Sequence, residues 1–171
     1  GDEPFLVLLP DDIIASKVPV TKQMLEVYEK YGQGTISIMK VSREEVSRYG
    51  IIAGESWADG LYRIRTLVEK PDVSFAPSNL AIIGRYLLPP VIFEYLAETE
   101  RDGSGEIQLT DALARLSRER ALIGYEFDGR RHDIGDKVGF LTANIAYGLQ
   151  REDIGPQLRA FLRQKIEDGE I

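Results

Sequence analysis

The sequence predicts an α/β protein in which a mixed, mostly parallel sheet of Rossmann-like type is flanked by helices. Short apolar runs typical of strands alternate along the 171 residues with segments of helical periodicity. Hydrophobic residues make up 43% of the chain and charged residues 29%, a balance that excludes disordered and collagen-like proteins. Because no internal repeat, low-complexity tract or linker interrupts the chain, residues 1–171 are expected to form a single α/β unit.

The first elements follow from apolar runs and from the residues that end them. Residues 5–9 are apolar and predict a fully buried strand, which Pro10 ends. A buried strand so close to Gly1 suggests that an upstream part is missing. Thr21 can cap a helix that runs to about residue 31 and ends at glycines.

The middle of the chain predicts strands joined by turns and short helices. A strand at 35–41 precedes a helix start at 42–45. The strands 51–53 and 61–69 would pair as a hairpin around a turn at 54–60. A loop at 72–78, a buried strand at 80–87 and a helix at 91–97 follow, the helix opened by two prolines.

The last elements have the clearest helical pattern. Leu109, Ala112, Leu113 and Leu116 recur at helical spacing and predict a helix from residue 108. Two short strands at 121–127 and 131–134 are expected to form a hairpin around Asp128–Gly129. Helices are expected from residue 136 or 137 to 150 and from 154 to 167.

Charge and composition narrow the classes of function. There are 21 Lys and Arg against 28 Asp and Glu, which gives a net charge of −7 and argues against binding a nucleic-acid backbone. The chain has no cysteine, which excludes disulfides and thiolate metal sites and is compatible with the cytoplasm. No apolar run is long enough to cross a membrane.

Two aspartates could hold a metal ion. Asp11 follows the first predicted strand and Asp133 closes a late one, so both could meet at the carboxyl edge of a sheet. Two carboxylates are typical protein ligands for Mg²⁺ beside phosphates. The alternative is that they cap turns or helices, and His132 is expected to be a half-buried, satisfied side chain.

Two further clusters carry groups suited to a sugar phosphate. Glu69 can accept hydrogen bonds from hydroxyls, and Lys70 offers a positive charge for a phosphate. The glycine at Gly50 permits close approach of a ligand, and the segment Asn79, Leu80 and Ala81 begins with an amide suited to a polyol. A strand-end ion pair and simple turns are the alternatives, and Thr110 is expected only to start a helix.

The order of these motifs resembles the sugar-nucleotidyltransferase superfamily, and within it the bacterial UTP-glucose-1-phosphate uridylyltransferases. The resemblance covers essentially the whole chain. The segments that carry it are Leu9-Pro10-Asp11-Asp12, Tyr49-Gly50, Val68-Glu69-Lys70-Pro71, Ser78-Asn79-Leu80-Ala81, Gly105-Glu106-Ile107-Gln108-Leu109-Thr110-Asp111 and His132-Asp133-Ile134-Gly135.

The resemblance implies Mg²⁺-dependent uridylyl transfer from UTP to glucose 1-phosphate, giving UDP-glucose and pyrophosphate. It implies that Asp11 and Asp133 bind the metal, that Glu69 holds glucose hydroxyls and that Lys70 meets phosphate, so that Asp11, Lys70 and Asp133 form the catalytic set. The sugar pocket would be lined by Gly50, Asn79, Leu80 and Ala81. A homo-oligomer in the cytoplasm is also implied.

The chain departs from the family pattern at its amino terminus. The glycine-rich loop with an arginine and the lysine-bearing segment that bind the nucleotide are not found. We therefore expect the carboxyl-terminal part of such an enzyme, with little turnover by itself. A non-catalytic binding module and a related thymidylyl- or cytidylyltransferase are the alternatives.

Overall fold

The computed structural model describes residues 1–103 and 105–170, so Ser104 of the predicted glycine loop lies outside the described residues. The sequence predicts one unit. The structure divides into two compact units, the first formed by Gly1–Leu9 and Ser16–Gly129 and the second by Pro10–Ala15 and Arg130–Ile171. Each unit is described by itself.

The first unit contains a six-stranded sheet in the order β1-β6-β3-β7-β5-β4. An additional pairing of β6 with β4 closes five of these strands into a ring. The strands are β1 (Phe5–Leu8), β3 (Gly34–Lys40), β4 (Gly50–Ala58), β5 (Leu61–Glu69), β6 (Leu80–Leu88) and β7 (Leu122–Glu126).

The prediction of a mostly parallel sheet is wrong. Among the described strands, β3 and β7 form the only parallel pair, and every other pairing is antiparallel. Apolar periodicity reports burial and not strand direction, so it could not separate the two arrangements. The strand β1 was also expected to be fully buried, but it lies at a sheet edge and is half-buried.

Side chains from several strands fill the interior of the ring. Ile38, Ile52 and Ile64 are almost fully buried there and converge on Gly124. A Cβ at Gly124 would lie 2.8 Å from Ile52 Cδ1 and 3.1 Å from Ile38 Cδ1, so glycine makes room for the isoleucines. A larger side chain at position 124 would therefore overpack the interior.

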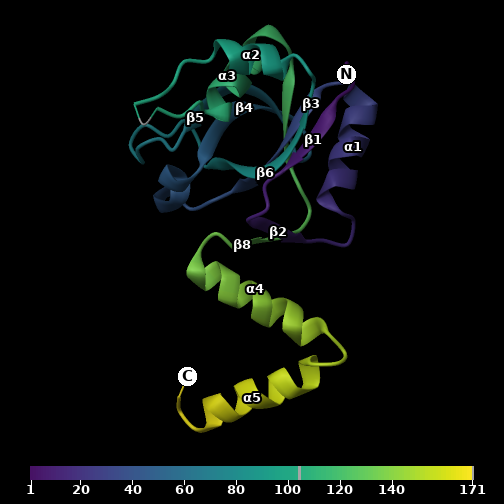
Figure 1. Cartoon of the computed structure of the whole chain (residues 1–171), viewed down its shortest axis with the longest axis vertical. Helices are drawn as coiled ribbons and strands as arrows, with labels where there is room; N and C mark the ends of the chain where they lie inside the picture. The colour runs from purple at the N-terminus through teal and green to yellow at the C-terminus, as the bar shows by residue number, and fades with distance from the viewer. Residues whose placement is uncertain (104, 171) are drawn as a thin grey trace. The chain divides into compact units, whose positions relative to one another are not determined.

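Helices cover the sheet of the first unit (Figure 1). α3 packs on β5 and against α2, and α1 packs on β3. The predicted stripe on α3 is buried, with Ala112, Leu113 and Leu116 each 1% exposed. The helices are α1 (Val20–Tyr31), the short 3₁₀ helix η1 (Arg43–Arg48), α2 (Ile92–Glu98) and α3 (Leu109–Glu119).

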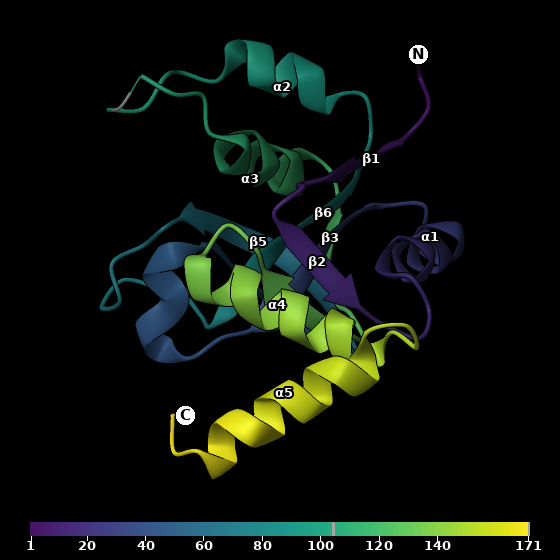
Figure 2. The same ribbon diagram turned by 60° about the horizontal axis from the view of Figure 1, so that its bottom comes forward.

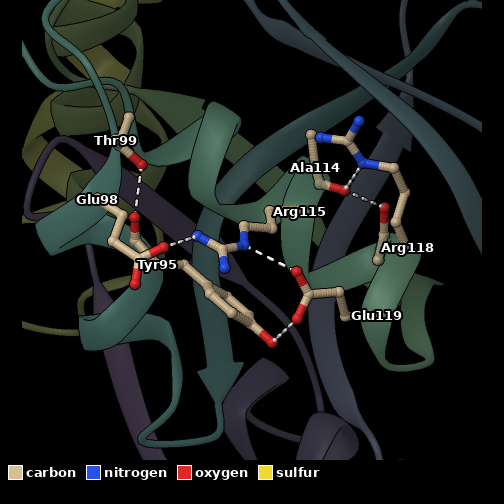
Figure 3. A network of polar contacts seen from close by, with 8 residues as sticks. Tyr95, Glu98, Thr99, Ala114, Arg115, Arg118 and Glu119 are labelled. Carbon is tan, nitrogen blue, oxygen red and sulfur yellow. Dashed lines mark hydrogen bonds and ion pairs between the residues drawn. The ribbon is translucent and has the colours of Figure 1, made fainter.

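A polar network joins α2 to α3 on the surface of the first unit (Figure 3). The Arg115 guanidinium lies over the Tyr95 ring, with its carbon 4.5 Å from the ring centre, and pairs with Glu98 and Glu119. The Tyr95 hydroxyl donates to Glu119 at 2.8 Å. Hydrogen bonds from Arg115 and Tyr95 lower the pKa of the Glu119 carboxyl, and the bond to Glu119 raises the pKa of Tyr95.

The second unit consists of a two-stranded antiparallel sheet and two helices that contact each other near the turn between them (Figure 2). Its elements are β2 (Asp12–Ala15), β8 (Arg130–Asp133), α4 (Lys137–Gln150) and α5 (Gly155–Glu167). The strand β2 is absent from the predicted elements. Large apolar side chains along α4 are exposed, among them Val138, Phe140 and Leu141.

Two local predictions about hairpins have opposite outcomes. The β4–β5 hairpin is confirmed, although its strands extend through the predicted turn and leave only residues 59–60 between them. The predicted hairpin around Asp128–Gly129 is wrong, because β7 pairs with β3 and β5 whereas β8 pairs with β2. In the described part of the chain, no helix is long and apolar enough to cross a membrane.

Candidate functional site

Glu69 and Lys70 end strand β5 in an unusual backbone conformation. Lys70 has φ of +40°, which is rare for a residue with a side chain and is further disfavoured before a proline. Neighbouring side chains in a regular strand point to opposite faces. Here the turn at Lys70 instead brings its Nζ atom to 3.9 Å from Glu69 Oε1. A carboxylate oxygen and an ammonium group therefore lie on the same side of the chain.

The strained conformation is held by the neighbouring strand. The Lys70 N–H donates to the Tyr49 carbonyl at 3.0 Å, and Gly50 pairs with Glu69 in the β4–β5 ladder. Such backbone conformations cost about 1–3 kcal/mol each and persist where the surroundings determine them. The Lys70 side chain remains 65% exposed, so its charge is open to a ligand.

The Glu69 carboxylate lies against Gly50 and Thr110. Its Oε2 atom accepts a hydrogen bond from Thr110 Oγ1 at 2.6 Å. A Cβ at Gly50 would lie 3.0 Å from the same Oε2, 3.1 Å from Ile82 Cδ1 and 3.4 Å from Thr110 Oγ1. Gly50 is therefore a position where the lack of a side chain lets the carboxylate approach the strand closely.

Thr110 is the residue that the sequence prediction missed at this site. It was expected only to start a helix, and it does occupy the first turn of α3. Its hydroxyl, however, donates to a side chain 41 positions away. The sequence signal was its place in the segment Gly105–Asp111, which carries part of the family resemblance.

The predicted wall residues lie on and before strand β6. Leu80 and Ala81 are buried and pair with Ile52 and Ile51 of β4, so Ala81 is next to the strand that begins at Gly50. The Asn79 side-chain amide donates to the Val41 carbonyl at 3.1 Å. The structure thus brings Gly50, Glu69, Lys70 and Ala81 into one region of the first unit. The Asn79 side chain is hydrogen-bonded to Val41, the residue that follows β3.

Asp11 and Asp133 lie close together in the second unit. Asp11 is in the turn before β2, and Asp133 is the last residue of β8. Asp11 Oδ2 and Asp133 Oδ1 are each 3.4 Å from the point where Gly135 would carry a Cβ. The two oxygens are therefore within twice that distance of each other, and Asp133 Oδ1 also accepts a hydrogen bond from the Gly135 N–H at 3.2 Å.

The neighbouring Asp12 has a different environment. Asp12 is 6% exposed and forms an ion pair with Arg131 Nε, and the Nη2 atom of the same guanidinium lies 3.2 Å from Asp133 Oδ2. The register of the two-stranded sheet places Asp12 opposite Asp133. Arg131 therefore connects a buried carboxylate to the candidate metal carboxylate, while Asp11 is exposed.

The donor set around Gly135 fits a hard divalent cation better than a zinc ion. Among the described residues, no three His, Cys, Asp or Glu side chains gather closely enough to enclose a metal by themselves. Mg²⁺ is commonly held by one or two carboxylates with phosphates and water completing the shell. His132 was expected to be half-buried but is buried, and its ring lies beside the Tyr147 ring with centroids 5.6 Å apart.

Comparison with known proteins identifies relatives of this chain. A family model described as "Nucleotidyl transferase" matches residues 1–149. A UTP–glucose-1-phosphate uridylyltransferase of Staphylococcus epidermidis is 45% identical over 165 residues, which are 96% of this chain and 57% of that protein. One of Bacillus subtilis is 42% identical over all 171 residues and 59% of its own length. The chain thus spans somewhat more than half of these relatives.

Solved structures agree with the sequence relatives. A UDP-glucose pyrophosphorylase complexed with UDP-glucose superimposes with a TM-score of 0.85 at 47% identity, covering 88% of this chain and 58% of the other. A UTP-bound enzyme from Acinetobacter baumannii gives a TM-score of 0.81 at 32% identity, covering 95% and 56%. With a matching family model over most of its length, the chain belongs to the nucleotidyl transferase family.

Proposed function

We propose that this chain supplies the glucose 1-phosphate site and the metal aspartates of a uridylyltransferase that makes UDP-glucose. The main support is the arrangement at the end of β5, where Glu69 and Lys70 present a hydroxyl acceptor and a cation 3.9 Å apart. A hexose 1-phosphate carries the matching groups, since it has hydroxyls on its ring and a dianionic phosphate at one end. One relative named above is a UTP–glucose-1-phosphate uridylyltransferase, and another is a UDP-glucose pyrophosphorylase complexed with UDP-glucose.

The proposed reaction requires positioning more than a protein nucleophile. A phosphate oxygen of glucose 1-phosphate forms a bond to the α-phosphorus of UTP, and the bond from that phosphorus to the bridging oxygen breaks. Pyrophosphate leaves with that electron pair. Two polyanions must be brought together in this step, so neutralised charge and fixed geometry provide most of the rate enhancement.

The residues of this chain would share these tasks. Glu69 would orient the hexose through its hydroxyls, and Lys70 would hold the sugar phosphate by its charge. Asp11 and Asp133 would hold Mg²⁺. When bound, the ion neutralises negative charge on the phosphate oxygens.

The nucleotide would be bound mainly by a part of the relatives that lies outside the match. The chain spans 57–59% of the uridylyltransferases named above. We therefore propose that the 171 residues alone release little or no pyrophosphate from UTP and glucose 1-phosphate. Robust turnover by the isolated chain would show that this division of labour is wrong.

Binding of glucose 1-phosphate tests the proposed site directly. The 19.2 kDa chain suits nuclear magnetic resonance with ¹⁵N labelling, and this method measures weak affinities. We expect glucose 1-phosphate to shift the amide signals of Gly50 and Ala81, and we expect Lys70→Met to weaken that binding. Leu25→Ala, on the exposed face of α1, is the matched control. Unshifted signals at Gly50 and Ala81 at saturating ligand would contradict the proposal.

A further inference from the structure

Thr110 makes a contact that the proposed reaction does not yet use. Its hydroxyl lies in the first turn of α3 and donates to Glu69 Oε2 at 2.6 Å. Thr110 is 7% exposed, whereas the Glu69 side chain is 28% exposed. A hydroxyl in a helix commonly bonds to a carbonyl of the preceding turn. Here it reaches instead from the helix to the end of strand β5.

This hydrogen bond is a minor part of what holds α3 in place. The helix packs on β5 through Ala112, Leu113 and Leu116, each 1% exposed. Burial of several apolar side chains contributes much more than the net gain from one hydrogen bond. The greater effect of the contact is therefore on the Glu69 carboxylate, which would otherwise rotate about three side-chain torsions.

The two oxygens of Glu69 have different surroundings. Oε2 is engaged by Thr110 and lies 3.0 Å from the point where Gly50 would carry a Cβ. Oε1 lies 3.9 Å from Lys70 Nζ, beside an exposed side chain. With Oε2 engaged from the protein side, Oε1 is the oxygen placed to accept a hydrogen bond from a ligand.

We propose that Thr110 is a positioning residue, which holds the Glu69 carboxylate in the orientation that accepts a sugar hydroxyl. Thr110 touches neither the sugar nor the reacting phosphates, and it acts through Glu69 alone. Because the carboxylate is oriented before the ligand arrives, binding does not have to restrict its torsions. This inference rests on the proposed function, because it assumes that Glu69 binds the hexose of glucose 1-phosphate.

The test compares Thr110→Val, which keeps the shape and removes the donor, with Thr110→Ser, which keeps the hydroxyl. We expect Thr110→Val to weaken glucose 1-phosphate binding about fivefold to tenfold and Thr110→Ser to retain most of the affinity. Binding of inorganic phosphate, which lacks the sugar, should change less than twofold in both variants. All affinities come from amide titrations of the 171-residue chain.

A double-variant cycle separates positioning from a general structural role. If Thr110 acts through Glu69, then adding Thr110→Val to Glu69→Ala should weaken binding no further. Additive losses in the cycle, or wild-type affinity in Thr110→Val, would overturn the inference while leaving the proposed function intact. If the unaltered chain does not bind glucose 1-phosphate, both proposals fail.

Discussion

Replacement of Gly50 by alanine should damage the sugar-phosphate site while leaving the fold almost unchanged. The added Cβ would lie 3.0 Å from Glu69 Oε2 and 3.1 Å from Ile82 Cδ1. Ordinary contacts between such atoms are about 3.5–4.0 Å, so each neighbour must move by about half an ångström. The Glu69 carboxylate is the softer neighbour, because it ends a flexible side chain.

The two effects on stability oppose each other. Overpacking of this kind costs about 1–3 kcal/mol, and the cost should be at the low end because the carboxylate can move. Alanine in a strand is favoured over glycine by about 0.5–1 kcal/mol. We therefore expect Gly50→Ala to lower the free energy of unfolding by about 1 kcal/mol or less, a change that urea denaturation can measure.

Binding should be affected more strongly than stability. Movement of Glu69 Oε2 strains its 2.6 Å hydrogen bond with Thr110 and turns Oε1 away from its place beside Lys70. We expect glucose 1-phosphate to bind about tenfold more weakly, which corresponds to about 1.4 kcal/mol. Gly103→Ala is the matched control, because a Cβ there meets no atom within 4 Å. If Gly50→Ala bound glucose 1-phosphate with wild-type affinity, the proposed dependence of binding on the position of the Glu69 carboxylate would be refuted.

Three further changes test other parts of the structure. Arg131→Met should lower the free energy of unfolding by about 3–5 kcal/mol, because it removes the cation that pairs with the buried Asp12 carboxylate. Adding Asp12→Asn to the same chain should recover part of this stability, as measured by urea denaturation. A loss below about 0.5 kcal/mol would show that the pair is effectively solvated. Asp11→Asn should weaken the binding of Mn²⁺, measured by electron paramagnetic resonance. Because Asp11 is exposed, the free energy of unfolding should stay within about 0.5 kcal/mol of that of the unaltered chain. Unchanged Mn²⁺ affinity would show that Asp11 is not part of the metal site. The hydrogen bond from Arg115 is the first cause of the lowered pKa of Glu119 in the folded chain. The ionised Glu119 therefore stabilises the fold at pH values above the ordinary glutamate pKa, and this stabilisation is lost as the pH falls through the lower pKa of the folded chain. Glu119→Gln should therefore show a shallower loss of stability on acidification than the unaltered chain, and parallel curves would contradict the assignment.

Local features of the fold were predictable because they depend on residues close in the sequence. The stripe on α3 and the β4–β5 hairpin follow from side-chain periodicity and short-range turn signals. The placement of Glu69 and Lys70 at a strand end followed in the same way. Pairings between strands far apart in the sequence did not, because any extended segment offers the same backbone donors and acceptors to many others. The parallel β3–β7 pair and the β2–β8 pair were therefore not predicted.

The sequence by itself was enough to propose which residues take part in the chemistry: two aspartates at strand ends, a Glu-Lys-Pro segment and a glycine suited to close approach. The tertiary structure alone decided how these groups are oriented. It placed Lys70 at a left-handed backbone conformation, Thr110 on Glu69 and Arg131 between Asp12 and Asp133. These features arise from a turn, a helix packed on a strand and a strand pairing, and the geometry of each depends on the packing of its whole unit. Residue types can be recognised along a chain, but the distances between them exist only after folding.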